Sequence, residues 1–337
     1  MGVPLRPLLE GCRHPVEWDA LFGVAAIDAN NALYQFLSII RQADGTPLQD
    51  DRGRVTSHLS GLLFRTTYFL EHGIRPFYIF DGTPPSLKAK TLSKRREIRE
   101  AGKEQWDDAL SRGDTEAAYR AAMQSSKVDR AIIESGQRLL DALGVPWMVA
   151  PSEGEAQSAF FVDAGIATYS VSQDYDSLLF GASVLVRNLT VSGKRRIRGK
   201  SVTISPERIY LFELLETLGI TREMLVQIAI LVGTDFNEGI YGIGPKKAMK
   251  IVRDGHFHET IAEKAPDLDP VPIMEFFLSP PITRDFHPEW RSPDSDLVVE
   301  ILCSEYGFST ERVQPVLNRI AGPPKGMSGQ QRLDAWF

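Results

Sequence analysis

Two pairs of carboxylates are the residues of this chain best placed to do chemistry. Glu153 and Glu155 form one pair, and Asp174 and Asp176 form the other. A predicted helix and a predicted strand separate the pairs, and a helix that joins two strands returns the chain to the same edge of a sheet. Four negative charges at one point repel one another, and a set of oxygen ligands favours Mg²⁺ or Mn²⁺. The spacing therefore predicts a divalent metal site.

Both pairs also have an interpretation that needs no metal. Ser152-x-x-Glu155 fits a capping box, in which Glu155 only satisfies amides at the start of a helix. Asp174 and Asp176 fit a turn, because Asp is a frequent turn residue. This stretch alone leaves the alternatives open.

The elements that must position these pairs follow from the apolar runs. Strands are expected over residues 22–27, 75–80, 145–150, 167–172 and 184–189. Helices are expected over 30–40, 57–71, 131–143, 156–163, 206–218, 221–231, 295–306 and 310–320. Strands that alternate with helices predict an α/β fold with a mostly parallel central sheet flanked by helices.

Acidic residues follow four of the expected strands. Asp28 comes after the first strand and Asp81 after the second, while the third and fourth strands lead into the two pairs above. Ligands of such sheets bind beyond the carboxyl ends of the strands. A structural role requires no acidic residue at each of four strand ends, so the recurrence favours the metal site over the capping and turn alternatives.

A basic segment stands out between residues 88 and 103. On a helix, Lys88, Arg95 and Arg99 would share one face. The charged segment continues to about residue 130 with little apolar periodicity, which predicts an exposed helical insertion. Because the segment is basic in an acidic protein, we favour contact with nucleic acid over a solvated charged helix. A second basic stretch, residues 193–200, predicts a turn or hairpin.

A seventh carboxylate, Asp235, precedes a glycine-rich turn that opens a predicted helix. The turn and the first turn of the helix contain Gly242, Gly244, Lys246 and Lys247. Backbone N–H groups at the start of a helix attract phosphate, and the lysines add positive charge. The turn is therefore a candidate for gripping a DNA backbone without reading sequence, although a tight packing turn between two helices has the same pattern.

Composition is that of an ordinary globular protein. The 337 residues are 43% hydrophobic and 24% charged, and the net charge is −6, so overall charge gives no sign of nucleic-acid binding. Two cysteines exclude a disulfide scaffold. Neither a signal peptide nor a membrane-spanning run is evident, so we expect a soluble, intracellular protein without membrane contact.

The chain ends in two large aromatic residues after a polar linker, residues 323–329. The terminal segment carries Gln330, Leu333, Trp336 and Phe337. A polar tail offers these apolar side chains no local core, so we expect them to dock on a partner.

Five motifs resemble those of one nuclease family. They are IFDG at 79–82, EGEAQ at 153–157, QDYDSLLFG at 173–181, GTDFNEGIYGIGPKKA at 233–248 and the terminal QQRLDAWF. Together they resemble the archaeal flap endonucleases of the XPG structure-specific nuclease family, over nearly the whole chain and least distinctively at 255–320. Thr234, Phe236 and Trp336 depart from the commoner residues of the motifs, but none of the candidate functional groups is lost through these departures.

The resemblance implies a PIN-like 5′ nuclease fold with a roughly seven-stranded core, a helical arch and a helix–two-turn–helix element. It implies cleavage of 5′ flaps at DNA junctions, as in Okazaki-fragment maturation and long-patch base excision repair, with associated 5′–3′ exonuclease activity. Two Mg²⁺ ions, or Mn²⁺ in their place, are implied. The first would be held by Asp28, Asp81, Glu153 and Glu155, and the second by Asp174, Asp176 and Asp235.

The resemblance also implies roles in binding DNA and a partner protein. Lys88 and Arg95 would contact the scissile phosphate and Tyr34 would stack on a base. Further DNA contacts would come from Arg41, Arg65, Glu153, Gly233, Asp235, Gly242, Gly244, Lys246 and Lys247. The tail would bind the sliding clamp (PCNA) through Gln330, Leu333, Trp336 and Phe337. The nuclease itself is expected to be a monomer in the archaeal cytoplasm or nucleoid.

The expected organisation has five parts. They are a nuclease region at 1–98, the arch at 99–130, a second nuclease region at 131–258 with the helix–two-turn–helix at about 220–254, a helical region at 259–322, and the linker with the clamp-binding tail at 323–337. Three alternative functions stay open: a related 5′ exonuclease, a Holliday-junction resolvase, and a non-catalytic junction-binding adaptor recruited by the clamp.

Overall fold

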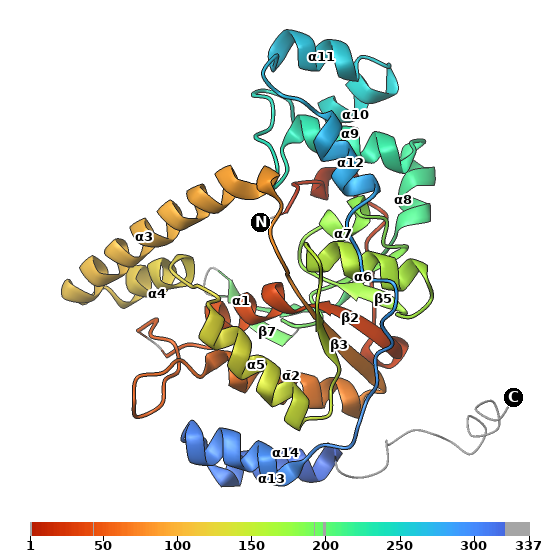
Figure 1. Ribbon diagram of the computed structural model, residues 1–337. Helices are drawn as coiled ribbons and strands as arrows, with labels where there is room; N and C mark the ends of the chain where they lie inside the picture. The colour runs from red at the N-terminus through yellow and green to blue at the C-terminus, as the bar shows by residue number, and fades with distance from the viewer. Residues whose placement is uncertain (1, 43, 192, 198–199, 321–337) are drawn as a thin grey trace, which may run out of the picture.

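A computed structural model of the protein describes residues 2–320 apart from 43, 192, 198 and 199 (Figure 1). Its central sheet has seven strands in the order β1-β9-β6-β5-β2-β3-β4. The strands are β1 (His14–Pro15), β2 (Gly23–Asp28), β3 (Ile74–Phe80), β4 (Trp147–Val149), β5 (Tyr169–Val171), β6 (Val184–Arg187) and β9 (Glu207–Tyr210). The strands from β6 to β4 pair in parallel, and β9 and β1 are antiparallel at one edge. The predicted α/β fold with a mostly parallel sheet is confirmed.

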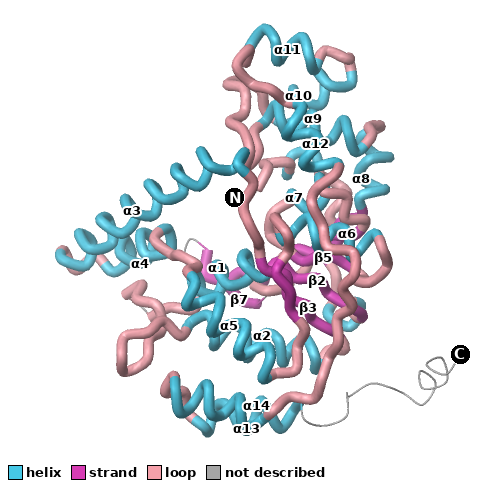
Figure 2. The backbone as a smooth tube through the Cα atoms, in the orientation of Figure 1, coloured by secondary structure: helices cyan, strands magenta, loops and turns pink. Residues whose placement is uncertain are grey.

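Helices cover both faces of the sheet, as the tube in Figure 2 makes clear. One face carries α1 (Ala29–Ile39), α2 (Ser57–Glu71) and α5 (Arg130–Ala142), backed by α13 (Ser295–Val299) and α14 (Thr310–Ile320). The other carries α6 (Gly154–Asp163). Alternate residues of β2 therefore enter different cores, with Ala25 and Ile27 on the first face and Val24 and Ala26 on the second. This two-sided burial explains why the strand reads as an unbroken apolar run.

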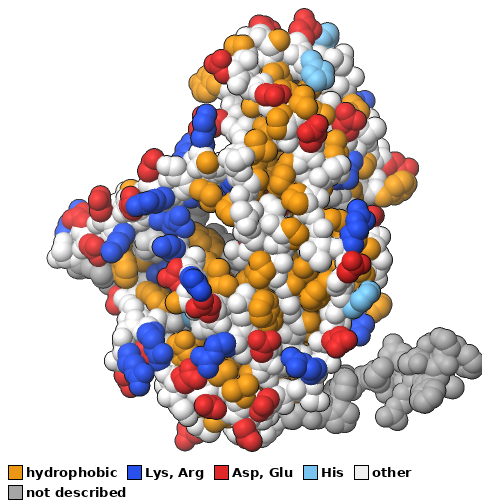
Figure 3. Space-filling model, viewed as in Figure 1, with side chains coloured by type: hydrophobic (Ala, Val, Ile, Leu, Met, Phe, Trp, Pro, Cys, Tyr) orange, Lys and Arg blue, Asp and Glu red, His pale blue; other side chains and the backbone are white. Residues whose placement is uncertain are grey.

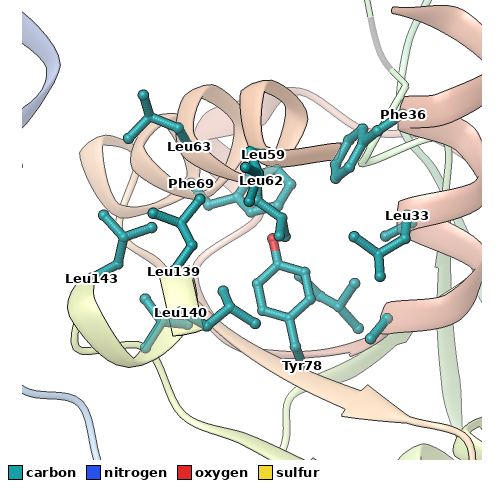
Figure 4. Packing of buried hydrophobic residues seen from close by; sticks show 14 of the residues in the cluster. Leu33, Phe36, Leu59, Leu62, Leu63, Phe69, Tyr78, Leu139, Leu140 and Leu143 are labelled. Atoms are coloured by element: carbon teal, nitrogen blue, oxygen red, sulfur yellow. The ribbon is translucent and has the colours of Figure 1, made fainter. Parts of the chain in front are cut away.

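Large apolar side chains fill the space between the sheet and the first helical layer (Figure 4). Leu33 of α1, Leu62 of α2, Leu139 of α5 and Tyr78 of β3 belong to this cluster, and each is at most 1% exposed. The hydroxyl of Tyr78 is satisfied inside the core by Thr66, at 2.8 Å. Close packing of this kind holds β2 and β3, and therefore the residues at their ends, in fixed positions.

A helical hairpin projects from the side of the molecule (Figure 1). Its helices are α3 (Ala89–Ser111) and α4 (Thr115–Gln124), and they pack against each other. The 23 residues of α3 span roughly 34 Å at the usual rise per residue. The predicted helical insertion is present, and the boundary expected between residues 98 and 99 falls inside α3.

A separate helical region lies beyond the carboxyl ends of the strands (Figure 1). It contains α8 (Leu211–Leu218), α9 (Arg222–Val232), α10 (Pro245–Arg253), α11 (Phe257–Lys264) and α12 (Val271–Leu278), which share a core with α7 (Asp176–Leu179). The expected basic hairpin is present as β7 (Gly193–Ile197) and β8 (Lys200–Ile204). A π-helical segment, Glu300–Glu305, follows α13. No helix within the described ranges is long and apolar enough to cross a membrane.

The helix expected over 206–218 is wrong in its first part. Residues Glu207–Tyr210 form β9, and the helix begins only at Leu211. Arg208 pairs with Val186 of β6 on one side and with His14 of β1 on the other. Because these partners lie far away in sequence, no local pattern reveals them. The strand pairing outweighs the local helical pattern over the four residues of β9. The other predicted elements lie within a few residues of their expected bounds.

Candidate active site

The four acidic strand ends lie next to one another in the sheet. β5, β2, β3 and β4 are consecutive strands, so Asp174, Asp28, Asp81 and Glu153 follow neighbouring carboxyl ends. Asp28 is the last residue of β2 and 8% exposed, and it caps α1 by accepting the N–H of Asn31 at 2.9 Å. The predicted meeting of both carboxylate pairs at one edge therefore agrees with the topology.

The capping box proposed for Ser152 and Glu155 is wrong. Glu153, not Ser152, is the N-cap of α6, and the Ser152 hydroxyl is buried without a hydrogen-bond partner. The Glu155 carboxylate instead accepts from the hydroxyl of Ser177 at 3.0 Å. Asp81 accepts the N–H of Gly154 at 2.8 Å, so the start of α6 is tied to the end of β3.

The second pair is held by the N-terminal segment. The N–H of Gly2 donates to Asp174 at 2.7 Å, and the N–H of Val3 donates to Asp176 at 2.9 Å. Asn31 also donates to Asp174, at 3.2 Å. A turn role alone would not bring in partners more than 140 residues away, so the turn alternative is insufficient. The sequence analysis missed Gly2, Val3 and Asn31. Of these, Asn31 could have been found, because it lies three residues after Asp28.

Two basic side chains lie among the carboxylates, at the start of the α3–α4 hairpin, which occupies the position of the predicted arch. The ammonium of Lys88 is 2.6 Å from Glu153 and 3.5 Å from Asp235, and Arg95 is 2.6 Å from Asp235. The helix face predicted to contain Lys88 is wrong for this residue. Lys88 lies outside α3, in the 3₁₀ turn Ser86–Lys88 before it. This turn buries Lys88 to 8% exposure and points it at the acidic cluster.

The positive charge near the carboxylates does not balance their negative charge. Burial raises the pKa of Asp28 and Glu155 well above the usual values, and neighbouring carboxylates raise them further. Burial together with Asp174 and Asp235 raises the pKa of Asp176 to about 7. Although burial opposes it, the pKa of Lys88 is raised by Glu153, Asp235 and Asp81. Two basic groups do not neutralise the cluster, and a divalent cation would lower these pKa values by supplying the missing charge.

The donor set fits a hard divalent cation in its chemistry. All seven acidic side chains offer oxygen, the ligand atom that Mg²⁺ and Mn²⁺ prefer. In the positions that the described residues occupy, no three His, Cys, Asp or Glu side chains surround a common point at coordination distance.

The other predicted DNA-contacting residues lie in different surroundings. Tyr34 on α1 is 42% exposed. Arg41 is engaged inside the protein, donating to the carbonyls of Leu37 and Gly45 and to the hydroxyl of Ser126. Arg65 lines a cavity of about 400 Å³ between α1, α2 and the basic hairpin. Basic and acidic side chains are interspersed over the arch in Figure 3.

The glycine-rich turn leads into α10 as predicted, with Gly244 as its N-cap. Gly242 has φ of +78°, a left-handed conformation that favours glycine, and Tyr241 beside it is fully exposed. Lys246 and Lys247 open the helix, and Lys247 donates to the carbonyl of Gly242 at 3.3 Å. Gly233 ends α9 with φ of +111°. The clamp-binding residues Gln330, Leu333, Trp336 and Phe337 lie outside the described residues.

Comparisons with known proteins agree with this arrangement. The XPG N-terminal domain matches residues 1–102, and the XPG I-region matches residues 144–235. Flap endonuclease 1 of Methanoculleus marisnigri is 57% identical over 337 residues, which cover all of both chains. The structure of flap endonuclease-1 from Methanococcus jannaschii superposes with a TM-score of 0.74 at 35% identity, covering 92% of this chain and 95% of that one. The catalytic core of Rad2 in complex with DNA substrate shares the fold, with a TM-score of 0.71 at 22% identity over 95% and 100% of the chains.

The two XPG regions define a structure-specific nuclease, a hydrolase of phosphodiester bonds, and the acidic sheet edge agrees with that class. Within that class the chain belongs to the flap endonucleases of the XPG family, since its full length matches curated members at more than half identity. Its activity is therefore cleavage of 5′ flaps in DNA, in replication and repair. Nucleases of this family are metal-dependent.

Proposed function

We propose that the chain cleaves 5′ flaps at DNA junctions with two Mg²⁺ ions, for which Mn²⁺ can substitute. Asp28, Asp81, Glu153 and Glu155 would hold one ion, and Asp174, Asp176 and Asp235 the other. The observation that carries the proposal is the set of acidic residues at the ends of four consecutive strands, with raised pKa values at Asp28, Glu155 and Asp176 and with Lys88 and Arg95 paired to Glu153 and Asp235. When bound, such ions supply a nucleophilic water at neutral pH and stabilise the leaving oxygen.

Lys88 and Arg95 would contact the scissile phosphate. What supports this is that both are hydrogen-bonded to carboxylates of the cluster, Lys88 to Glu153 and Arg95 to Asp235. Once Glu153 and Asp235 bind cations, these side chains can donate to phosphate oxygens instead. Their charge would then stabilise the negative charge that develops in the transition state.

The surrounding surface would grip DNA by its backbone and by the shape of the junction. Tyr34 would stack on a base beside the scissile phosphate, and Arg41, Arg65 and Gly233 would contact DNA near the site. The turn from Gly242 to Lys247 would bind a phosphate of the duplex through backbone N–H groups and lysine charge. Exonuclease action from a 5′ end would use the same site, because only the position of the strand end differs.

The tail would tether the nuclease to the sliding clamp. Leu333, Trp336 and Phe337 would form an apolar plug, and Gln330 would bond at its edge. Aromatic anchors of this kind contribute ~2 kcal/mol or more each at interfaces. A Trp336→Ala, Phe337→Ala double variant should lose clamp binding in calorimetry and clamp stimulation while keeping intrinsic flap cleavage. Undiminished clamp affinity would place the contact elsewhere.

A nicked double-flap substrate tests the whole proposal. We expect cleavage of the 5′ flap only when Mg²⁺ or Mn²⁺ is present. Cleavage confined to blunt or recessed 5′ ends would favour the exonuclease alternative, and symmetrical cleavage of a four-way junction would favour the resolvase. Tight binding without any cleavage would indicate a non-catalytic adaptor.

A further inference from the structure

Arg187 lies behind the loop that carries the second carboxylate pair. It is the last residue of β6, and its Nε donates to the carbonyl of Gln173 at 3.0 Å. Its Nη1 donates to the hydroxyl of Tyr175 at 2.6 Å, and the guanidinium lies 4.2 Å from the centre of that ring. Gln173 and Tyr175 are the two neighbours of Asp174, and Asp176 comes next. One side chain therefore contacts both neighbours of a candidate metal ligand, the backbone carbonyl of Gln173 and the side chain of Tyr175.

The side chain of Arg187 also lies near a carboxylate of the adjacent strand β9. It pairs in register with Glu207 of β9, whose carboxylate is 3.6 Å from Nη1. Arg13, just before β1, lies 3.7 Å from the same carboxylate oxygen. The Arg187 side chain is only 16% exposed. Glu207 Oε2 accepts no hydrogen bond from either arginine, so the hydrogen bonds that fix Arg187 are those to the loop of Asp174.

The backbone also turns directly after Arg187. Asn188 has φ of 63°, a left-handed conformation that Asn tolerates better than most residues. This turn ends β6 directly after Arg187. The side chain therefore leaves the strand at its carboxyl end, level with the loop after the neighbouring strand β5.

We propose that Arg187 is a positioning residue that sets the placement of Asp174 and Asp176 and thereby the cation affinity of the second site. The inference rests on the proposed function. Asp174 and Asp176 repel each other, and a loop free to move would relax by separating them. The planar guanidinium donates in two directions to two points of the loop, which a lysine with one terminal nitrogen cannot reproduce. Residues that orient metal ligands in this way typically change metal affinity by roughly 10–100-fold when they are replaced.

Arg208 offers a matched control on the adjacent strand. Its Nη2 donates to the carbonyl of Ala20 at 2.7 Å, and its Nη1 donates to the hydroxyl of Tyr210 at 3.2 Å. It thus makes the same kinds of contact as Arg187, to a backbone carbonyl and a tyrosine hydroxyl. The segments that Arg208 contacts carry no candidate metal ligand, so replacing Arg208 measures only the structural cost of losing such contacts.

The test compares Arg187→Gln and Arg187→Lys with Arg208→Gln and Arg208→Lys in the full chain. Mn²⁺ binding is measured by calorimetry without DNA, and single-turnover flap cleavage is measured as a function of Mg²⁺ concentration. We expect the Arg187 variants to bind Mn²⁺ about 10-fold or more weakly and to need a correspondingly higher Mg²⁺ concentration for half-maximal rate. Excess Mg²⁺ should restore most of the rate, and the Arg208 variants should match wild type. Tyr175→Phe, which removes only one acceptor, should give a smaller loss in the same direction.

Two results would overturn the inference. Unchanged Mn²⁺ affinity in a folded Arg187→Lys protein would show that the loop needs no brace. Weaker junction binding with an unchanged Mg²⁺ dependence would make Arg187 a DNA contact instead. If the wild-type protein neither bound Mn²⁺ nor cleaved, the proposed function itself would fail, and that result is separate from the comparison among variants.

Discussion

The ammonium group of Lys88 lies 2.6 Å from the carboxylate of Glu153, joining the base of the arch to the start of α6. Both side chains are nearly buried, so the pair is shielded from solvent. Arg95, in the second turn of α3, makes the equivalent contact with Asp235. Lys88 and Arg95 therefore reach the carboxylates from the start of the helical hairpin.

Replacing Lys88 should reduce the rate of cleavage more than the affinity for DNA. Lys88→Ala removes a donor close to the reacting phosphate, and we expect a loss of ~10²-fold or more in single-turnover rate. Saturating enzyme should not restore the rate. Arg130→Ala, which removes an exposed pair with Glu134 on α5, is the control and should cleave normally. A full rate at saturating Lys88→Ala enzyme would make this residue a phosphate anchor.

Enlarging Gly2 should disturb the second carboxylate pair. A Cβ at this position would lie 2.6 Å from Asp174 Cβ and 2.6 Å from Asp176 Oδ1, closer than such atoms approach. Gly2→Val should therefore weaken Mn²⁺ binding and slow cleavage. Pro4→Ala, at an exposed position of the same segment, should do neither. Normal Mn²⁺ affinity in the Gly2→Val protein would contradict the placement of this segment.

The glycine-rich turn gives a prediction about DNA affinity that is independent of catalysis. A Cβ on Gly244 would meet no atom within 4 Å, so Gly244→Val should fold normally and yet obstruct a phosphate. Lys247→Ala should weaken junction binding and reduce the slope of log K against log salt by about 1, because fewer counterions are released. Lys264→Ala on α11 is the control for loss of charge. An unchanged salt slope for Lys247→Ala would show that this lysine does not meet the backbone.

A buried histidine should make stability depend on pH. His58 of α2 is bonded to Ser135 of α5 at 2.8 Å, and burial lowers its pKa from 6.5 to about 4. Between these values the unfolded chain binds a proton that the folded protein does not. The contribution of His58 is therefore fully present above pH 6.5 and is lost as the pH falls towards 4, by up to about 3 kcal/mol.

Urea unfolding of wild type and His58→Gln checks this sign. Glutamine cannot take up the proton, so the wild-type protein should lose more unfolding free energy than the variant between pH 7 and pH 4.5. The comparison cancels the opposite trend of Asp28, Glu155 and Asp176, whose pKa values are raised. Parallel pH curves for the two proteins would refute the assignment.

The sequence carried most of the positional information about the acidic site. Asp28 and Asp81 follow apolar runs whose lack of alternation predicts buried strands, and parallel strands place their carboxyl ends together. What could not be predicted depends on contacts over long distances in sequence. Gly2 and Val3 reach Asp174 and Asp176 across more than 170 residues, and no local pattern marks them. Arg187 was missed for the same reason, because an arginine at the end of a strand reads as a solvated residue.

Substitution of Asp174 tests the central claim, that the acidic sheet edge is a metal-dependent nuclease site, most directly. Single-turnover cleavage of a nicked double-flap substrate in Mg²⁺ is compared for wild type and Asp174→Ala, with junction binding measured in parallel. We predict a loss of several orders of magnitude in rate with junction binding retained, because the folded shape and the basic surfaces remain. Cleavage by the Asp174→Ala protein within about tenfold of wild type would contradict the claim.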